Sequence, residues 1–169
     1  ITRAEMAALH FIKQQQEIML LAKLSQAQEI LQTVTAAEPD NDQATVLLGQ
    51  SFLSSDYDRA VSTVAPINLG SKYLEEAEAI KTLASLYRRI DAAESLPEDP
   101  VKEEYLDAIS NTRSNDFEAA LDGFLQVIRK NRYYDDDGSR KACIAVFKLL
   151  GEDHEMTRRY RPALTGALY

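Results

Sequence analysis

Apolar residues recur at intervals of three and four along most of this chain, and the clearest example lies between residues 27 and 52. Residues at this spacing share one face of an α-helix, so the pattern predicts two helices that pack against each other. A proline between them ends the first helix, because its ring removes a hydrogen-bond donor and clashes with the preceding turn. We expect Ala27 and Gly49 to lie where helix backbones approach closely, since larger side chains would separate them. The positions that carry the pattern are Ala27, Leu31, Val34 and Pro39, followed by Leu48, Gly49 and Phe52.

Related patterns occur twice further along the chain. Tyr57 and Ala60 follow an aspartate in a short turn, and Phe117 and Ala120 follow an aspartate in the same arrangement. An acidic residue, an aromatic residue and an alanine at this spacing are typical of the second helix of a tetratricopeptide hairpin, whose period is about 34 residues. The interval from Ala27 to Ala60 is 33 residues. The chain therefore resembles a tetratricopeptide array, a helical repeat that usually binds proteins and rarely performs chemistry.

These patterns predict an all-α, tetratricopeptide-like helical-repeat array of about nine helices without strands. The first helix should cover residues 3–21, and Ser25 should open the second through a capping box with Gln28. Near the end of the chain, Pro162 should kink or restart the last helix. The expected parts are tetratricopeptide hairpins over residues 1–71, a long connecting helix and proline loop over 72–100, and a C-terminal hairpin with capping helices over 101–169.

Composition narrows the functions that such an array would serve. The 169 residues are 45% hydrophobic and carry a net charge of −8, which argues against general nucleic-acid binding. No apolar run approaches the roughly 18 residues that span a bilayer, so no membrane insertion is expected. No signal peptide is visible at the helix-like start. Because the chain begins with Ile1 rather than Met, we expect it to be a fragment of a longer protein.

The charge is unevenly distributed along the chain. Residues 129–169 carry a net charge of +3, so the remaining residues carry −11. An acidic body with a mildly basic end is compatible with electrostatic docking to a partner. The other interpretation is that these charges only cover solvated helix faces.

No residue pattern indicates catalysis, a cofactor or a metal. Cys143 is the only cysteine and lies in an apolar helical run, so we expect a buried structural thiol rather than a redox thiol. A single cysteine also suits a reducing compartment. The acidic run from Asp135 to Gly138 lacks the alternating ligands of a calcium loop, so Asp136 or Asp137 is expected to cap a helix. His10 and His154 have no cysteine or histidine at ligand spacing.

A concave groove is the first candidate surface for a partner. Tetratricopeptide arrays present the first helices of their hairpins on this face, which places Gln43, Val46, Gln50 and Leu53 along it. Their mixture of apolar and amide side chains favours extended peptide segments. It lacks the Lys and Asn with which some tetratricopeptide domains clamp an acidic C-terminal tail. The alternative is that the long helix over residues 72–93 fills the groove.

The last third of the chain carries a more specific pattern. Over Val101–Tyr169 it resembles the C-terminal tetratricopeptide region of the YbbN-type thioredoxin-like proteins, the chaperedoxins. The resemblance implies an upstream thioredoxin-fold domain, absent from this chain, and a bacterial cytoplasmic co-chaperone that holds unfolded clients for a GroEL-type chaperonin. The residues that carry it are Asn115-Asp116-Phe117-Glu118-Ala119-Ala120-Leu121, Asp137-Gly138-Ser139-Arg140-Lys141, Leu149-Leu150-Gly151, Tyr160-Arg161, Leu164 and Leu168-Tyr169.

The C-terminal helix is the second candidate surface, because the resemblance implies that it contacts the chaperonin. The matching residues are Tyr160, Arg161, Leu164, Leu168 and Tyr169. On a continuous helix most of the apolar ones share a stripe flanked by arginines, which would favour an acidic partner surface. The alternative is that this helix only covers the open end of the array, as a repeat protein requires.

Two other functions remain compatible with the sequence. The chain could be a structural scaffold or oligomerisation repeat without a chaperone role, or a regulatory domain of a larger enzyme. The sequence upstream of Ile1 would separate them. A thioredoxin fold there favours the co-chaperone, and another catalytic domain favours the regulatory domain. The absence of any upstream domain would favour the scaffold.

Overall fold

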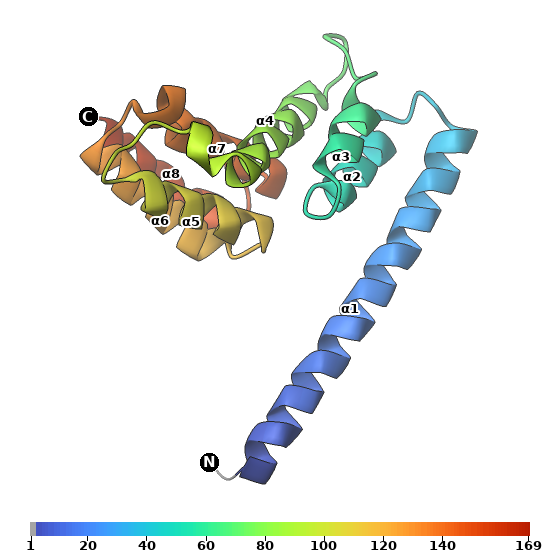
Figure 1. Ribbon diagram of the computed structural model, residues 1–169. Coiled ribbons are helices and arrows are strands. Elements are labelled where there is room, and N and C mark those ends of the chain that lie inside the picture. Colours follow the sequence, from blue (N-terminus) through green and yellow to red (C-terminus); the bar gives the residue numbers. More distant parts are fainter. Residues whose placement is uncertain (1–2) are drawn as a thin grey trace.

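The computed structural model describes the backbone of residues 3–169 and the side chains of residues 15, 19 and 21–169. That part of the chain contains eight α-helices, one 3-10 turn and no strand, which confirms the all-α helical array expected from the sequence. Figure 1 shows α2–α8 gathered together while α1 extends away from them toward the N-terminus. The elements are α1 (Arg3–Ala37), α2 (Asp42–Phe52), α3 (Tyr57–Val64), α4 (Leu74–Asp91), η1 (Ala93–Ser95), α5 (Lys102–Arg113), α6 (Phe117–Lys130), α7 (Tyr134–Leu150) and α8 (Glu155–Leu168).

α1 is one helix of 35 residues, so the expected division into two helices at Ser25 is wrong. The residues around Ser25 are Ala, Lys, Leu and Gln, which favour a helix, and no glycine or proline interrupts them. Ala27 is exposed, and therefore the close backbone approach expected at this position is also wrong. The second half of α1 meets α2, where the Gln28 side chain donates a hydrogen bond to the Ser51 carbonyl at 2.9 Å.

The α2–α3 pair is a tight helical hairpin. Asn41 caps α2 by accepting from the Ala44 amide at 3.0 Å, and Asp56 caps α3 in the same way. A Cβ atom added at Gly49 would lie 2.5 Å from Val64 Cγ1, which confirms the close approach expected at Gly49. The two helices therefore depend on a residue without a side chain at their crossing.

The α5–α6 pair repeats this arrangement in the second half of the chain. Asp116 caps α6 by accepting a hydrogen bond from the Ala119 amide at 3.2 Å. Ala120, Phe124 and Val127 are all at most 1% exposed, so the apolar face predicted for this helix is completely covered. Of the predicted repeats, this hairpin therefore buries its apolar face most completely.

α4 and α7 run antiparallel and join the two halves of the molecule. An ion pair between Glu75 and Lys148 links the start of α4 to the end of α7, and Arg89 meets Asp135 at the opposite end, 3.0 Å apart. One apolar stripe of α4 is buried in the core that it shares with both hairpins. Its fully or nearly fully buried members are Ala77, Ile80, Ala84 and Tyr87.

The start of α7 differs from the expected helix cap. Asp135, Asp136 and Asp137 have φ angles of 48°, 56° and 62°, so they form a left-handed turn rather than an N-cap. Such a turn costs about 1–2 kcal/mol per residue in a chain of L-amino acids. Ion pairs of Asp136 with Lys141 and of Asp137 with Arg140 help to hold it. At the far end, Gly151 has a φ of +85° and ends α7.

Tyr105 fixes the left-handed turn from the side of α5. Its hydroxyl donates a hydrogen bond to Asp135 Oδ2 at 2.9 Å. A Cβ atom added at Gly138 would lie 2.1 Å from the same hydroxyl, so this position accepts no larger residue. Tyr105 therefore holds the left-handed turn, and the space that its hydroxyl occupies requires glycine at residue 138.

Candidate protein-binding site

An apolar pocket of about 410 Å³ opens where α1, α2 and α4 meet the turn before α6. Its lining comes from five helices and the α5–α6 turn, so only the folded array assembles it. The chemistry suits an apolar ligand group, because leucine and aromatic side chains make up most of the lining. We call this cavity the leucine-lined pocket. Its lining residues are Leu24, Leu31, Leu47, Gln50, Ser51, Leu53, Ser54, Leu83, Tyr87, Asn115, Phe117 and Leu149.

The pocket has a buried floor and an accessible rim. Leu83 and Tyr87 of α4 form the floor and are only 1% and 3% exposed. Leu24 of α1 and Leu47 of α2 lie on the rim, with exposed fractions of 37% and 46%. Large apolar side chains that remain accessible beside a pocket are a common mark of a protein-binding surface.

The groove residues expected on α2 are only partly where the sequence places them. Val46 and Leu53 are buried, whereas Gln43 and Gln50 are exposed. Val46 and Leu53 share a helix face with Gly49, and a Cβ atom at Gly49 would lie 3.5 Å from Ile80 of α4. α4 therefore packs against this face, as the alternative interpretation holds, and Val46 does not line an open groove.

The accessible apolar surface of α2 lies on the helix face next to the predicted one. Gln50 and Leu53 still border the pocket, but Leu47 provides its exposed apolar edge. The sequence contains a signal for this, because Leu47 lies beside the apolar stripe of Leu48 and Phe52 rather than within it. The contributions of Leu83 and Leu149 have no such signal, since they depend on the tertiary contact between α4 and the rest of the array.

The C-terminal helix α8 packs against α6 and α7. Tyr160 and Leu164 are 3% and 6% exposed, and the Tyr160 hydroxyl donates to Asp122 of α6 at 2.9 Å. This burial favours the alternative that the same stripe closes the end of the array. Leu168 is half-buried and Tyr169 is fully exposed. The side chains of α8 that remain accessible to a partner are Tyr169 and outward-facing residues such as Arg161.

The arginines of α8 already have intramolecular partners. Arg158 pairs with Asp153 and Arg161 with Glu152, at 2.7 Å and 2.6 Å, while Arg159 pairs with Glu118 of α6. All three pairs are solvent-exposed, so each contributes at most about 1 kcal/mol to stability. Pro162 lies inside α8 without dividing it, and the expected restart of the helix is wrong.

The single thiol lies away from both candidate surfaces. Cys143 is completely buried, as expected for a structural cysteine, and burial raises the pKa of its thiol to about 12. A thiol in this state is a poor nucleophile, because the reactive species is the thiolate. Among the residues that the structure describes, no cluster of three His, Cys, Asp or Glu side chains is arranged to hold a metal ion.

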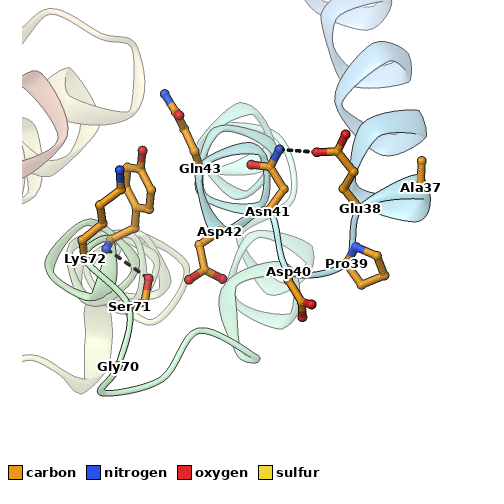
Figure 2. A pocket seen from close by; sticks show the side chains of 11 residues that line it. Ala37, Glu38, Pro39, Asp40, Asn41, Asp42, Gln43, Gly70, Ser71 and Lys72 are labelled. Carbon is orange, nitrogen blue, oxygen red and sulfur yellow. Dashed lines mark hydrogen bonds between the residues drawn. The ribbon is translucent and has the colours of Figure 1, made fainter.

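A larger, polar hollow of about 900 Å³ lies between the α1–α2 loop and the α3–α4 loop. Figure 2 shows Glu38, Asn41 and Asp42 on one side of it and Ser71 and Lys72 on the other. The Asn41 side chain donates to Glu38 at 2.8 Å, so these polar groups partly satisfy one another. None of its lining residues is buried, which distinguishes this hollow from the leucine-lined pocket.

Comparison with known proteins identifies the class of this array. A family model described as tetratricopeptide repeat matches residues 76–169, which is more than half of the chain. The chain belongs to the tetratricopeptide repeat family. The match begins inside α4, a helix in which the sequence shows no clear repeat pattern. No curated protein and no solved structure matches the chain.

Within the described part of the chain, no helix is long and apolar enough to cross a membrane.

Proposed function

We propose that this chain is the non-catalytic, protein-binding domain of a thioredoxin-like co-chaperone of the bacterial cytoplasm, and that it holds apolar segments of unfolded clients. The observation that carries the proposal is the leucine-lined pocket with its exposed rim at Leu24 and Leu47. Tetratricopeptide arrays are generally protein-interaction modules. The thioredoxin-like and chaperonin-related parts of the proposal rest on the resemblance over Val101–Tyr169.

The chemistry of the pocket favours unfolded segments over a charged ligand. Its floor is apolar, and the polar groups at its edge are neutral amides and hydroxyls such as Gln50, Ser51 and Asn115. Unfolded chains expose leucine, phenylalanine and similar side chains next to free backbone amides. An apolar side chain would fill the floor while the amides at the edge hydrogen-bond to the backbone beside it.

Client binding is tested by replacing the rim without disturbing the core. Leu47→Asp should abolish most of the ability of the domain to prevent aggregation of a chemically unfolded client, as measured by light scattering. Leu69→Asp is the matched control, because Leu69 is 92% exposed and lies outside the pocket. Equal activity of both variants and the wild type would reject the pocket as the client site.

The chaperonin contact implied by the resemblance would use the side chains of α8 that stay exposed. We therefore assign it to Tyr169 and to the outer side of Arg161 rather than to Tyr160 and Leu164. Tyr169→Ser should reduce co-purification with a GroEL-type chaperonin and leave the melting temperature unchanged. Unchanged co-purification would leave α8 with the role of a structural cap only.

A scaffold or oligomerisation role is the second candidate, and the exposed apolar residues of α1 favour it. Met19, Leu21 and Ile30 are 54%, 64% and 57% exposed along the extended helix. A chain that assembles through α1 and has no effect on client aggregation would favour this role. The triple replacement of these residues by serine should then dissolve the assembly.

A further inference from the structure

A second apolar groove, of about 320 Å³, runs between α4 and α7. Its floor contains Leu74 and Ala79 of α4 and Ile144 and Ala145 of α7. Ile144 is 38% exposed, which is unusual for a large aliphatic residue on a helix that is otherwise buried along its inner face. None of these residues belongs to the leucine-lined pocket or to the contacts of α8.

The two edges of this groove carry opposite charges. Glu75 and Glu78 lie along the α4 edge, and Lys141 and Lys148 lie along the α7 edge. The side chains of the two glutamates are 69% and 59% exposed, and those of the two lysines are 45% and 31% exposed. Glu78 already pairs with Lys81 and Lys141 with Asp136, and a ligand adds to these pairs if it presents a basic edge opposite α4 and an acidic edge opposite α7.

A second copy of the same chain meets this requirement, and we propose that the groove is a homodimer interface. A twofold axis that runs along the groove places the acidic α4 edge of each copy over the basic α7 edge of the other. The two Ile144 side chains then lie on the apolar floor between the copies. A twofold axis across the groove would instead place acidic edges on acidic edges, so the charges select one orientation.

The antiparallel arrangement of α4 and α7 gives these contacts a register. Glu75 and Lys148 lie at the same end of the groove, where they form an ion pair within each copy. An axis along the groove preserves that end, so Glu75 of each copy faces Lys148 of the other. The two intramolecular Glu75–Lys148 pairs then lie face to face, so that acidic and basic side chains alternate among the four residues. No favourable contact within either copy has to break.

The contact is small, and we expect weak and reversible self-association. Stable interfaces bury roughly 800 Å² per partner, more than a groove lined by nine residues provides. Sedimentation equilibrium on the complete chain, from about 1 to about 500 μM, should show a monomer–dimer equilibrium. The dimer should weaken as salt concentration rises, because exposed ion pairs are screened.

Charge reversal provides the decisive test. The variant E75K/E78K has two basic edges and the variant K141E/K148E has two acidic edges, so each should dimerise at least tenfold more weakly than the wild type. An equimolar mixture of the two variants should form a heterodimer, because basic edges then face acidic edges. The variant that carries all four reversals should recover self-association.

The control is E94K/E103K, which changes the net charge as much as E75K/E78K does but alters exposed residues outside the groove. It should dimerise like the wild type, and circular dichroism melts should show that every variant is folded. A wild-type chain that stays monomeric over the whole range overturns the proposal and leaves the groove to a different partner. The proposal is also overturned if the mixture fails to associate, or if serine replacements at Met19, Leu21 and Ile30 abolish the dimer.

Discussion

The helices that contain Ala27 and Ala120 share one sequence pattern and differ in how completely they are packed. In α6, Ala120, Phe124 and Val127 are buried, and α5, α7 and α8 surround the helix. In α1 the equivalent alanine is exposed, and Leu31 and Val34 are only half-buried. The pattern therefore predicts a helix with an apolar face in both places, whereas burial of that face depends on the neighbours that the fold supplies.

The missing neighbour of α1 explains the difference. α6 follows α5 in a hairpin, so that each helix covers the other, and a Cβ atom at Gly123 would already lie 2.9 Å from Ala108 Cβ. The segment before Ala27 instead continues the same straight helix away from the body (Figure 1). Part of the face that a preceding helix would cover thus remains open and forms one side of the leucine-lined pocket.

The largest expected contrast is between the apolar residues four positions after each alanine. Phe124→Ala should lower the free energy of unfolding by about 3–5 kcal/mol, because it leaves a cavity in a closed core. Leu31→Ala should cost less than about 2 kcal/mol, since this side chain is only partly buried. Urea unfolding followed by circular dichroism measures both, and equal losses would show that α1 is as tightly packed as α6.

Replacing glycine by alanine should show how tightly the helices cross in each of the two hairpins. Gly49→Ala and Gly123→Ala should each cost about 1–3 kcal/mol, because the new methyl groups would lie within 3 Å of neighbouring side chains. Gly166→Ala is the control, since no atom lies within 4 Å of its added Cβ. It should stabilise α8 by up to about 1 kcal/mol through helix propensity alone. A neutral result at Gly49 would indicate that the α2–α3 crossing adjusts freely.

The reactivity of cysteine thiols should also distinguish the closed core around α7 from the open face of α1. The pKa of Cys143 is raised from its ordinary value to about 12 by burial, so the native thiol should react with a disulfide reagent at pH 8 only after unfolding. A cysteine placed at residue 27 in a Cys143→Ala background should react rapidly without denaturant, because Ala27 is exposed. Rapid labelling of native Cys143 would show that the α7 core opens readily.

The raised pKa of Cys143 also affects stability at alkaline pH. The folded state keeps the thiol proton to a higher pH than the unfolded state, so this contribution to stability is full below about pH 9 and is lost as the pH rises toward 12. At pH 10.5 the loss should be about 2 kcal/mol. Cys143→Ala should lack this component and retain that of the tyrosines, such as Tyr160, whose pKa burial and Asp122 raise to about 12.

The smallest effect is expected where α1 has no neighbour. Ala27→Leu should change the free energy of unfolding by no more than about 0.5 kcal/mol, as for other exposed helix positions. The equivalent change Ala120→Leu adds a large side chain to a fully buried position and should cost about 1–3 kcal/mol. Similar values for the two variants, measured by urea unfolding, would contradict the proposed difference in packing.

Much of the fold follows from local sequence, because helix periodicity and caps are local properties. Asn41, Asp56 and Asp116 cap helices through contacts three residues away, and Gly49 marks a real helix crossing as its position predicts. Errors arise where a distant contact decides the outcome. The left-handed turn at Asp135 is one such case, since Tyr105 and Arg89 hold it from other helices.

The candidate sites were harder to predict for the same reason. A helical stripe shows which residues share a face, but it does not show what lies opposite that face. Val46 and Tyr160 both belong to stripes that the array buries, whereas Leu47 lies outside its stripe and remains exposed. An apolar residue out of phase with the buried face is therefore the more informative signal for a binding surface.

The position of α8 has a consequence for the synthesis of the chain. Because α8 follows α6 and α7 in the chain, the surfaces of α6 and α7 that receive Tyr160 and Leu164 stay uncovered until α8 has left the ribosome. A nascent chain released after Gly151 would carry these apolar surfaces unprotected. This part of the array therefore reaches its final packing only after α8 has been synthesised, and premature stops within α8 should yield aggregation-prone products.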